Sequence, residues 1–144
     1  MRDAVSVRIL DWRDAAPRVM PLRERVFVVE QGVPAELERD ANDPLCRHAV
    51  AESGAGLVVG TGRLLPDGHI GRMAVASEWR SAGVGGKILE ALVDEAARLG
   101  FAEVVLNAQL GAVAFYLRHG FAAEGEVFVE AGIEHRTMRR RLAG

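Results

Sequence analysis

The 144-residue sequence has few residues of the kinds that build disulfide, metal or membrane structures. Its single cysteine, Cys46, cannot form an internal disulfide and has no CxxC motif or histidine–cysteine cluster around it. No apolar run reaches the roughly 20 residues that a membrane-spanning helix needs, and the first residues lack the apolar core of a signal peptide. These absences exclude a disulfide scaffold and a zinc ribbon. They predict a cytoplasmic protein without a bound metal and without a membrane partner.

The sequence also lacks an excess of charge of either sign. Its 18 lysine and arginine residues stand against 20 aspartate and glutamate residues, for a formal net charge of -2. General nucleic-acid binding needs a strongly basic surface, so we expect no nucleic-acid partner. Lysine itself is almost missing, because Lys87 is the only one.

The length and the apolar content predict one domain over residues 1–144. A chain of this size buries about 70% of the surface that its unfolded form exposes. With 49% hydrophobic residues it can form a core without disulfides or metal. No repeat, linker or low-complexity tract divides it.

The spacing of apolar residues predicts a mixture of strands and helices. Alternation with a period of two indicates strands, and apolar residues three or four apart indicate helices. We expect strands over residues 5–10, 48–52, 57–65, 70–76, 104–106, 126–130 and 135–142, and helices over residues 16–30, 84–99 and 112–119. The order is β-α-βββ-α-β-α-ββ, which is an α/β (α+β) fold with a mixed sheet and helices on its faces.

Three local features add detail to this order. Pro21 is expected at the first position of its helix, where proline is favoured. The acidic stretch 35–43 is expected to be a loop or a single helical turn. The last strand is rich in arginine and is expected to be a charged edge strand that resists aggregation rather than a surface for nucleic acid. Its arginines are Arg136, Arg139, Arg140 and Arg141.

The strongest chemical signal is a glycine-rich turn between the strand 70–76 and the long helix that follows. Glycines let an anion approach the backbone N–H groups at the start of a helix, and those groups bind phosphate well. Arg80 and Lys87 flank the turn and can add positive charge. The alternative is that the glycines only make a tight connection between strand and helix.

Two well-known phosphate motifs do not fit this turn. A Walker A loop would have Ser81 in place of its first glycine and Ile88 in place of its serine or threonine. A dinucleotide fingerprint would have Ile88 in place of its third glycine. The turn is therefore neither of these.

The pattern Arg80-x-x-Gly83-x-Gly85 resembles the acetyl-coenzyme A pyrophosphate signature of the GNAT superfamily of N-acetyltransferases. The following segments are similar to the next strand and helix of that family. They read Leu106-Asn107-Ala108-Gln109, then Ala112, Ala114, Phe115-Tyr116 and Gly120-Phe121. The segments Val26-Phe27-x-x-Glu30-Gln31-Gly32 and Phe128-x-Glu130-x-Gly132-Ile133-x-His135 are similar to the ElaA-like branch.

The resemblance implies acetyl-coenzyme A (acetyl-CoA) as co-substrate, with no metal. The backbone of Met73, Ala74 and Val75 is expected to pair with the pantetheine arm. The pyrophosphate is expected on the N–H groups of Arg80, Ser81, Ala82, Gly83, Val84 and Gly85, with Gly86 and Lys87 close by. Asn107 is expected to be a further residue that binds the cofactor.

The resemblance also implies a transfer of acetyl to a primary amine by direct attack in a ternary complex. Tyr116 is the candidate general acid for the leaving thiolate, or else an aromatic residue of the core. Glu30 and His135 are the candidate general bases. Glu30 could instead be a solvated carboxylate at a helix end, and His135 an ordinary strand histidine. A water chain could then take the proton.

Three further residues are candidates for binding the acceptor. Arg63 and Arg72 suit a carboxylate or phosphate on the acceptor, or are paired surface charges. Gln109 could orient the acceptor or water, or satisfy backbone groups where the sheet splays. Cys46 as a nucleophile of a ping-pong route is disfavoured, because no basic motif beyond His48 surrounds it.

A homodimer is expected by analogy with the family.

Two other functions stay open at the level of sequence. The chain resembles acyl-homoserine-lactone synthases, which share the fold and use S-adenosylmethionine. The segments concerned are Arg23-x-x-Val26-Phe27, Glu38-x-Asp40-x-x-Asp43 and Arg63-Leu64-Leu65-Pro66. The third possibility is a non-catalytic module that binds acyl-CoA.

Overall fold

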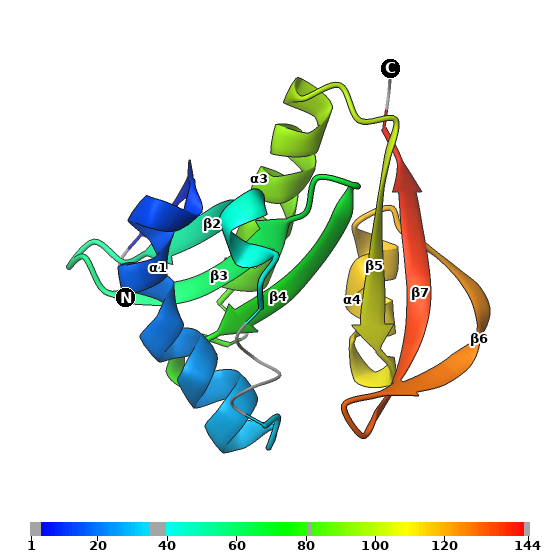
Figure 1. Cartoon of the computed structure of the whole chain (residues 1–144), viewed down its shortest axis with the longest axis horizontal. Helices are drawn as coiled ribbons and strands as arrows, with labels where there is room; N and C mark the ends of the chain where they lie inside the picture. The colour runs from blue at the N-terminus through cyan, green and yellow to red at the C-terminus, as the bar shows by residue number, and fades with distance from the viewer. Residues whose placement is uncertain (1–3, 35–39, 81, 143–144) are drawn as a thin grey trace.

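The computed structural model describes residues 4–34, 40–80 and 82–142. In this part of the chain seven strands form one sheet, in the order β1-β2-β3-β4-β5-β7-β6 (Figure 1). The strands are β1 (Ser6–Leu10), β2 (Arg47–Glu52), β3 (Val58–Leu64), β4 (His69–Val75), β5 (Glu103–Gln109), β6 (Ala122–Glu130) and β7 (Ile133–Arg141). The α-helices are α1 (Trp12–Arg23), α3 (Val84–Arg98) and α4 (Val113–Arg118). The predicted α/β class and element order are confirmed.

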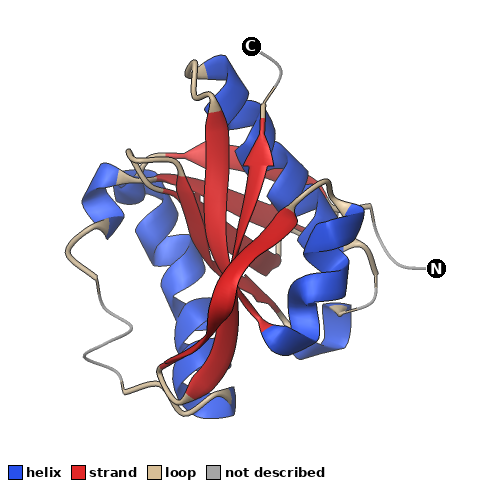
Figure 2. Cartoon of the chain, turned by 90° about the vertical axis from the view of Figure 1, so that its right-hand side faces the viewer, coloured by secondary structure: helices blue, strands red, loops and turns tan. Residues whose placement is uncertain are grey.

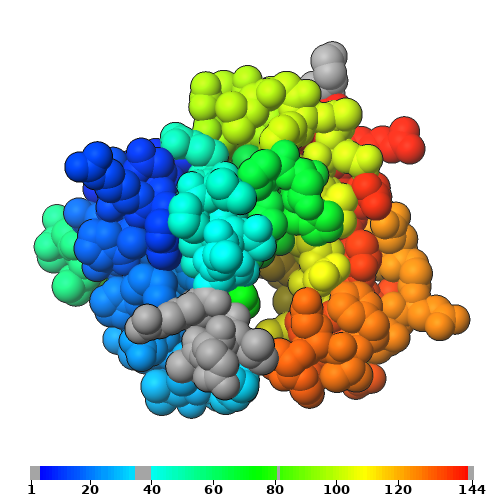
Figure 3. Space-filling model, in the orientation of Figure 1, coloured from blue at the N-terminus to red at the C-terminus, as the bar shows by residue number. Residues whose placement is uncertain are grey.

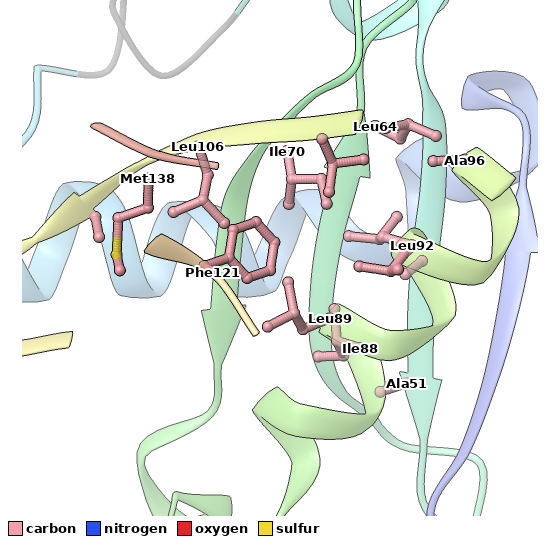
Figure 4. Packing of buried hydrophobic residues seen from close by; sticks show 14 of the residues in the cluster. Ala51, Leu64, Ile70, Ile88, Leu89, Leu92, Ala96, Leu106, Phe121 and Met138 are labelled. Atoms are coloured by element: carbon pink, nitrogen blue, oxygen red, sulfur yellow. The ribbon is translucent and has the colours of Figure 1, made fainter. Parts of the chain in front are cut away.

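Helices cover both faces of the sheet (Figure 2). Side chains alternate along β2, so Ala49 and Ala51 join the cluster around α3, whereas Val50 packs against Ala15 and Val19 of α1. In the larger cluster the apolar stripe of α3 packs together with residues of β2, β3, β4, β5 and β7. In Figure 4 this cluster includes Ile88, Leu89, Leu92, Ile70, Leu106, Phe121 and Met138.

The first helix differs from its prediction. It begins at Trp12 rather than at residue 16, because the Asp11 carboxylate accepts a hydrogen bond from the Asp14 N–H and caps the helix. Pro21 therefore lies inside the helix and not at its first position, so that prediction was wrong. After α1 the chain continues as a π-helical segment, Glu24–Glu30.

The arginine-rich strand β7 is not an edge strand. It lies between β5 and β6, so the edge-strand prediction was wrong. Two of its arginines are held by carboxylates of neighbouring elements: Arg139 pairs with Glu124 at 2.9 Å, and Arg140 with Glu90 at 3.2 Å. Cross-strand and helix carboxylates thus balance a run of charge that the sequence alone places at the surface.

The remaining segments are close to prediction or lie outside the described residues. Of the acidic stretch 35–43, residues 35–39 are not described, and Asp43–Leu45 forms a 3₁₀ turn. In the described residues no helix combines the length and hydrophobicity needed to cross a membrane. The same residues contain no group of three or more histidine, cysteine or acidic side chains placed to hold a metal ion.

Gly62 on β3 allows α3 to approach the sheet closely. A Cβ atom there would lie 2.9 Å from Leu92 Cδ1 and 3.0 Å from both Ile88 Cγ2 and Met73 Cγ. Overpacking of this kind costs about 1–3 kcal/mol, so Gly62→Ala is expected to lower the free energy of unfolding by that amount in urea titrations. Gly71→Ala on β4 is the matched control, because no atom lies within 4 Å of the added Cβ. Equal stability of the two variants would contradict this packing argument.

Candidate active site

Strands β4 and β5 are the only parallel pair of neighbours in the described sheet, and they soon separate. They pair at His69↔Val105 and Ile70↔Leu106 and nowhere further along. Figure 1 shows the two strands diverging toward the C-terminal end of each. In the described part of the chain no strand pairs with the edge of β4 beyond Ile70 that faces β5. Backbone groups on this edge can therefore accept an extended ligand as an added strand.

A bulge in the β3–β4 ladder accounts for the separation. The register changes between Thr61↔Ala74 and Arg63↔Gly71, which leaves an extra residue on β4. Arg72 lies in this extra stretch with a φ of 48°, a left-handed conformation that is rare for a residue with a side chain. A bulge bends its strand and increases the twist, so β4 turns away from β5 at this point.

A cavity of about 710 Å³ lies at the separation of the two strands. Figure 3 shows the molecule hollowed in this region, between the N-terminal half and the β6–β7 hairpin. The predicted site residues that line the cavity come from β3, β4, β5, α4 and β7. They are Arg63, Arg72, Met73, Asn107, Gln109, Tyr116 and His135. Glu30, Ala74, Val75 and the described residues of the glycine-rich turn are not among its lining residues.

Tyr116 presents its hydroxyl to the cavity from α4. The ring is wedged edge-on between Phe115 and Phe121, with ring centroids 5.0 and 5.9 Å away. The hydroxyl lies 3.7 Å from the sulfur of Met73, a weak acceptor on the exposed edge of β4. Burial raises the pKa of Tyr116 to about 12. The phenol therefore stays protonated at neutral pH, as a proton donor must.

The raised pKa can be measured directly, because Tyr116 is the only tyrosine of the chain. The ultraviolet absorbance of tyrosinate is expected to appear with a midpoint near pH 12. Ordinary tyrosine titrates at about 10. Circular dichroism recorded on the same samples checks that the protein is still folded. A midpoint near 10 in folded protein would show that the phenol is solvated and would contradict the burial.

His135 lies in β7 and lines the same cavity. Its Nδ1 is 2.6 Å from the carbonyl oxygen of Ile133, and its Nε2 is 3.9 Å from Glu130 Oε2. The ring stacks on Phe128 with centroids 5.8 Å apart, and only 7% of the residue is exposed. The imidazole is thus held in one orientation beside the cavity.

Glu30 lies closer to the glycine-rich turn than to the cavity. Its carboxylate pairs with Arg80 at 2.9 Å, and the Arg80 Nε donates to the carbonyl oxygen of Val75. Arg80 therefore connects the end of the π-helical segment to the end of β4. A carboxylate held by this guanidinium is poorly placed to take a proton in the cavity.

The glycine-rich turn ends in Gly83, whose φ of 81° suits glycine, and α3 begins at the next residue. Among the described residues no side chain caps this helix, so in this part of the chain the N–H groups of Val84, Gly85 and Gly86 have no capping side-chain partner. The Lys87 ammonium, expected at the rim of the anion site, instead donates to the carbonyl oxygen of Val5 at 3.2 Å. Ser81 lies outside the described residues.

A buried cluster of ion pairs lies beneath the cavity. Arg23 of α1 binds both carboxylate oxygens of Asp43 at 3.1 Å, and Arg63 of β3 binds Asp43 at 2.7 Å. Arg63 also binds Asp40 at 2.8 Å, and Arg72 lies 3.3 Å from the same carboxylate. Arg63 is therefore a buried charge rather than a surface charge, and its guanidinium holds Asp40 and Asp43 in place.

Asp40 is the carboxylate through which this cluster reaches the cavity. Burial alone would raise the pKa of Asp40. The Asn42 N–H and the guanidinium groups of Arg63 and Arg72 outweigh this effect, and the pKa is lowered to about 2. The carboxylate is therefore ionised at neutral pH and faces the cavity beside Arg72.

Two amide side chains of β5 face the cavity. Asn107 Oδ1 accepts a hydrogen bond from the Thr137 hydroxyl at 3.1 Å, where β5 pairs with β7. Gln109 Nε2 lies 3.4 Å from Gln31 Oε1, which follows the π-helical segment. The second contact links β5 to the end of the π-helical segment at the cavity.

Cys46 is buried, in agreement with its rejection as a nucleophile. Its thiol donates to the carbonyl oxygen of Asn42, and burial raises its pKa to about 11. The thiol is protonated at neutral pH and is not activated for attack.

Sequence reasoning missed Glu130 as a site residue. The predicted last strands, 126–130 and 135–142, leave a four-residue gap. In the structure β6 and β7 meet in a turn of two residues, Ala131 and Gly132, with φ values of 53° and 77°. Positive φ at both positions defines a type I′ hairpin, which the Ala-Gly pair signals only weakly. A prediction of this two-residue turn would have brought Glu130 next to His135 across the hairpin.

The fold and this cavity define an acyltransferase of the GNAT class. The family model described as acetyltransferase (GNAT) domain matches residues 13–142, and the chain belongs to this family. It is therefore an enzyme of the N-acetyltransferase kind, and the fold implies an acyl-CoA and an acceptor as substrates.

Individual relatives agree with this assignment. The uncharacterized N-acetyltransferase YjcF of Bacillus subtilis (strain 168) is 44% identical over 123 residues, which cover 83% of this chain and 87% of YjcF. An acyl-CoA N-acyltransferase from Pseudomonas aeruginosa has 33% identity and a TM-score of 0.84, over 95% of this chain and 99% of that one. Escherichia coli ElaA has 27% identity and a TM-score of 0.84, over 94% and 99%. The resemblance to the ElaA-like branch is confirmed.

Proposed function

We propose that this enzyme transfers acetyl from acetyl-CoA to a primary amine by direct attack in a ternary complex. The observation that carries the proposal is the Tyr116 hydroxyl at the separation of β4 and β5, where the Met73 sulfur is its one hydrogen-bond partner in the described part of the chain. A protonated phenol at this point can donate to a thiolate that leaves from a ligand bound along β4.

The proposed cofactor site would extend from β4 to the start of α3. The backbone of Met73, Ala74 and Val75 would bind the pantetheine arm along the open edge of β4, and one N–H would polarise the thioester carbonyl. The N–H groups from Arg80 to Gly85 would bind the pyrophosphate where α3 begins, with Gly86 and Lys87 close by; of these residues Ser81 lies outside the described part of the chain. Asn107 would face the arm from β5.

The acceptor would lie on the far side of the cavity. Arg72 and Gln109 would contact it there, and His135 would take the proton of the amine. Arg63 would position Asp40 instead of contacting the acceptor. Holding both substrates in one cavity converts the transfer into an effectively intramolecular reaction, which can supply much of the rate.

The test is the release of coenzyme A from acetyl-CoA with a panel of primary amines. We expect turnover with at least one amine and intersecting initial-velocity lines, because both substrates must be bound together. Parallel lines would show a covalent acetyl-enzyme and contradict direct attack. Tight binding of acetyl-CoA without turnover of any amine would favour a non-catalytic module.

Thermal shift distinguishes the proposed acetyltransferase from an enzyme of the acyl-homoserine-lactone-synthase kind. A ligand that binds the native state raises the melting temperature by mass action. Acetyl-CoA is expected to stabilise the protein and S-adenosylmethionine is not, because Asp43 is only 2% exposed and is occupied by Arg23 and Arg63. Stabilisation by S-adenosylmethionine would favour a reaction of the acyl-homoserine-lactone-synthase kind.

A further inference from the structure

The hairpin of β6 and β7 places a carboxylate beside the His135 imidazole at the wall of the cavity. Phe128 pairs with His135 and Glu130 pairs with Ile133 in the antiparallel ladder. Residues two apart on a strand share a face, so Glu130 and His135 are diagonal neighbours on one face of the hairpin. Both side chains line the cavity.

The contacts of the ring decide which nitrogen carries the proton. Nδ1 lies 2.6 Å from the carbonyl oxygen of Ile133. A carbonyl oxygen only accepts hydrogen bonds, so Nδ1 must be the donor. In the neutral imidazole the lone pair is then on Nε2, the nitrogen on the side of Glu130.

The distance from Nε2 to Glu130 Oε2 is 3.9 Å, which is too long for a hydrogen bond but close enough for an ion pair. Among the described residues no hydrogen bond to Nε2 is formed, so its lone pair can accept a proton from a ligand. Once Nε2 is protonated, the carboxylate stabilises the imidazolium. The side chain of Glu130 is 57% exposed, which gives the proton a route from the buried ring to solvent.

We propose that His135 Nε2 is the general base and that Glu130 is its positioning residue, an inference that rests on the proposed acetylation of an amine. The amine nitrogen attacks the thioester carbonyl carbon, the C–N bond forms, and one N–H proton passes to Nε2. The C–S bond breaks, and Tyr116 donates its proton to the leaving sulfur. Transfer of the Nε2 proton through solvent to the tyrosinate restores both residues, and the net products are the N-acetyl amine and free coenzyme A.

The first test needs no acceptor. Long-range ¹H–¹⁵N spectra of the resting protein distinguish protonated from unprotonated ring nitrogens, and the His135→Asn variant identifies the signals of His135 among the four histidines. At a pH where the ring is neutral we expect a protonated Nδ1 and an unprotonated Nε2. The opposite tautomer would overturn the proposal whether or not any amine is turned over.

The second test measures coupling between the two residues with acetyl-CoA and the best amine of the panel. His135→Asn is expected to lower kcat about 100-fold, the usual contribution of a general base. Because Glu130 is exposed, Glu130→Gln is expected to lower kcat only about three- to fivefold, with the KM for acetyl-CoA unchanged. In the His135→Asn background Glu130→Gln is expected to have no further effect.

Glu134→Gln is the matched control. Glu134 is next to His135 in β7 but lies on the opposite face of the strand, so the variant removes the same charge without facing the His135 ring. It is expected to leave kcat unchanged. An equal effect of Glu130→Gln with and without His135 would show a merely structural role and would overturn the assignment of Glu130. Full activity of His135→Asn toward an accepted amine would overturn the assignment of His135 and leave the acetyltransferase function standing.

Discussion

The Tyr116→Phe variant is expected to lose at least about 100-fold in kcat, because it removes the general acid that protonates the leaving thiolate. Binding of acetyl-CoA is expected to be unchanged. The phenylalanine ring keeps the contacts with Phe115 and Phe121, and only the hydroxyl beside Met73 is lost. Steady-state kinetics and calorimetric titration with acetyl-CoA measure the two quantities separately.

Stability distinguishes this catalytic effect from damage to the fold. The hydroxyl of Tyr116 has a thioether as its partner at 3.7 Å, which is a weak hydrogen bond. Removing it is expected to change the melting temperature little. A variant that keeps its melting temperature, its affinity for acetyl-CoA and its full turnover would eliminate Tyr116 as the acid.

The Asp43→Ala variant is expected to lose about 3–5 kcal/mol of unfolding free energy, the usual cost of breaking a buried ion pair from one side. Arg23 is 1% exposed and would lose both of its hydrogen bonds to the carboxylate, and Arg63 would lose one of its two acidic partners. Loss of the carboxylate that faces a buried guanidinium costs more than the pair itself is stabilising.

Urea titrations followed by circular dichroism measure this loss. Asp67→Asn is the control, because Asp67 lies in the exposed β3–β4 turn and accepts a hydrogen bond from the His69 N–H that asparagine preserves. We expect its stability to stay within about 0.5 kcal/mol of wild type. If Asp43→Ala does not fold, Asp43→Asn keeps the shape and allows the measurement. A loss below about 1 kcal/mol in both Asp43 variants would contradict a structural role for the cluster.

The sequence was informative wherever the signal is local. The glycines before α3, the apolar stripe of that helix and the alternation in β2 to β4 depend on neighbouring residues, and all of these elements appear where they were predicted. The order of elements and the parallel pairing of β4 with β5 then follow from the general rules of mixed sheets.

The parts of the site that were missed depend on contacts between distant segments. The sequence suggests a surface charge or an acceptor contact for Arg63, because nothing near it in the sequence shows that Asp43 lies against it. The position of Lys87 after the glycines predicts a contact at the anion site, and the sequence does not show that its ammonium also reaches the carbonyl oxygen of Val5, just before β1. The bulge at Arg72, which opens the cavity, has Gly71 beside it as its only local signal, and this signal is weak because glycine also occurs in β3 at Gly60 and Gly62.

The crystal structure of the complex with acetyl-CoA tests the central claim most directly. The pantetheine arm is expected along the edge of β4 at Met73–Val75, and the pyrophosphate on the N–H groups where α3 begins. The thioester sulfur is expected within hydrogen-bonding distance of the Tyr116 hydroxyl, with the acetyl group directed toward His135. A cofactor bound outside the separation of β4 and β5, or a thioester directed away from Tyr116, would contradict the proposed site and its mechanism.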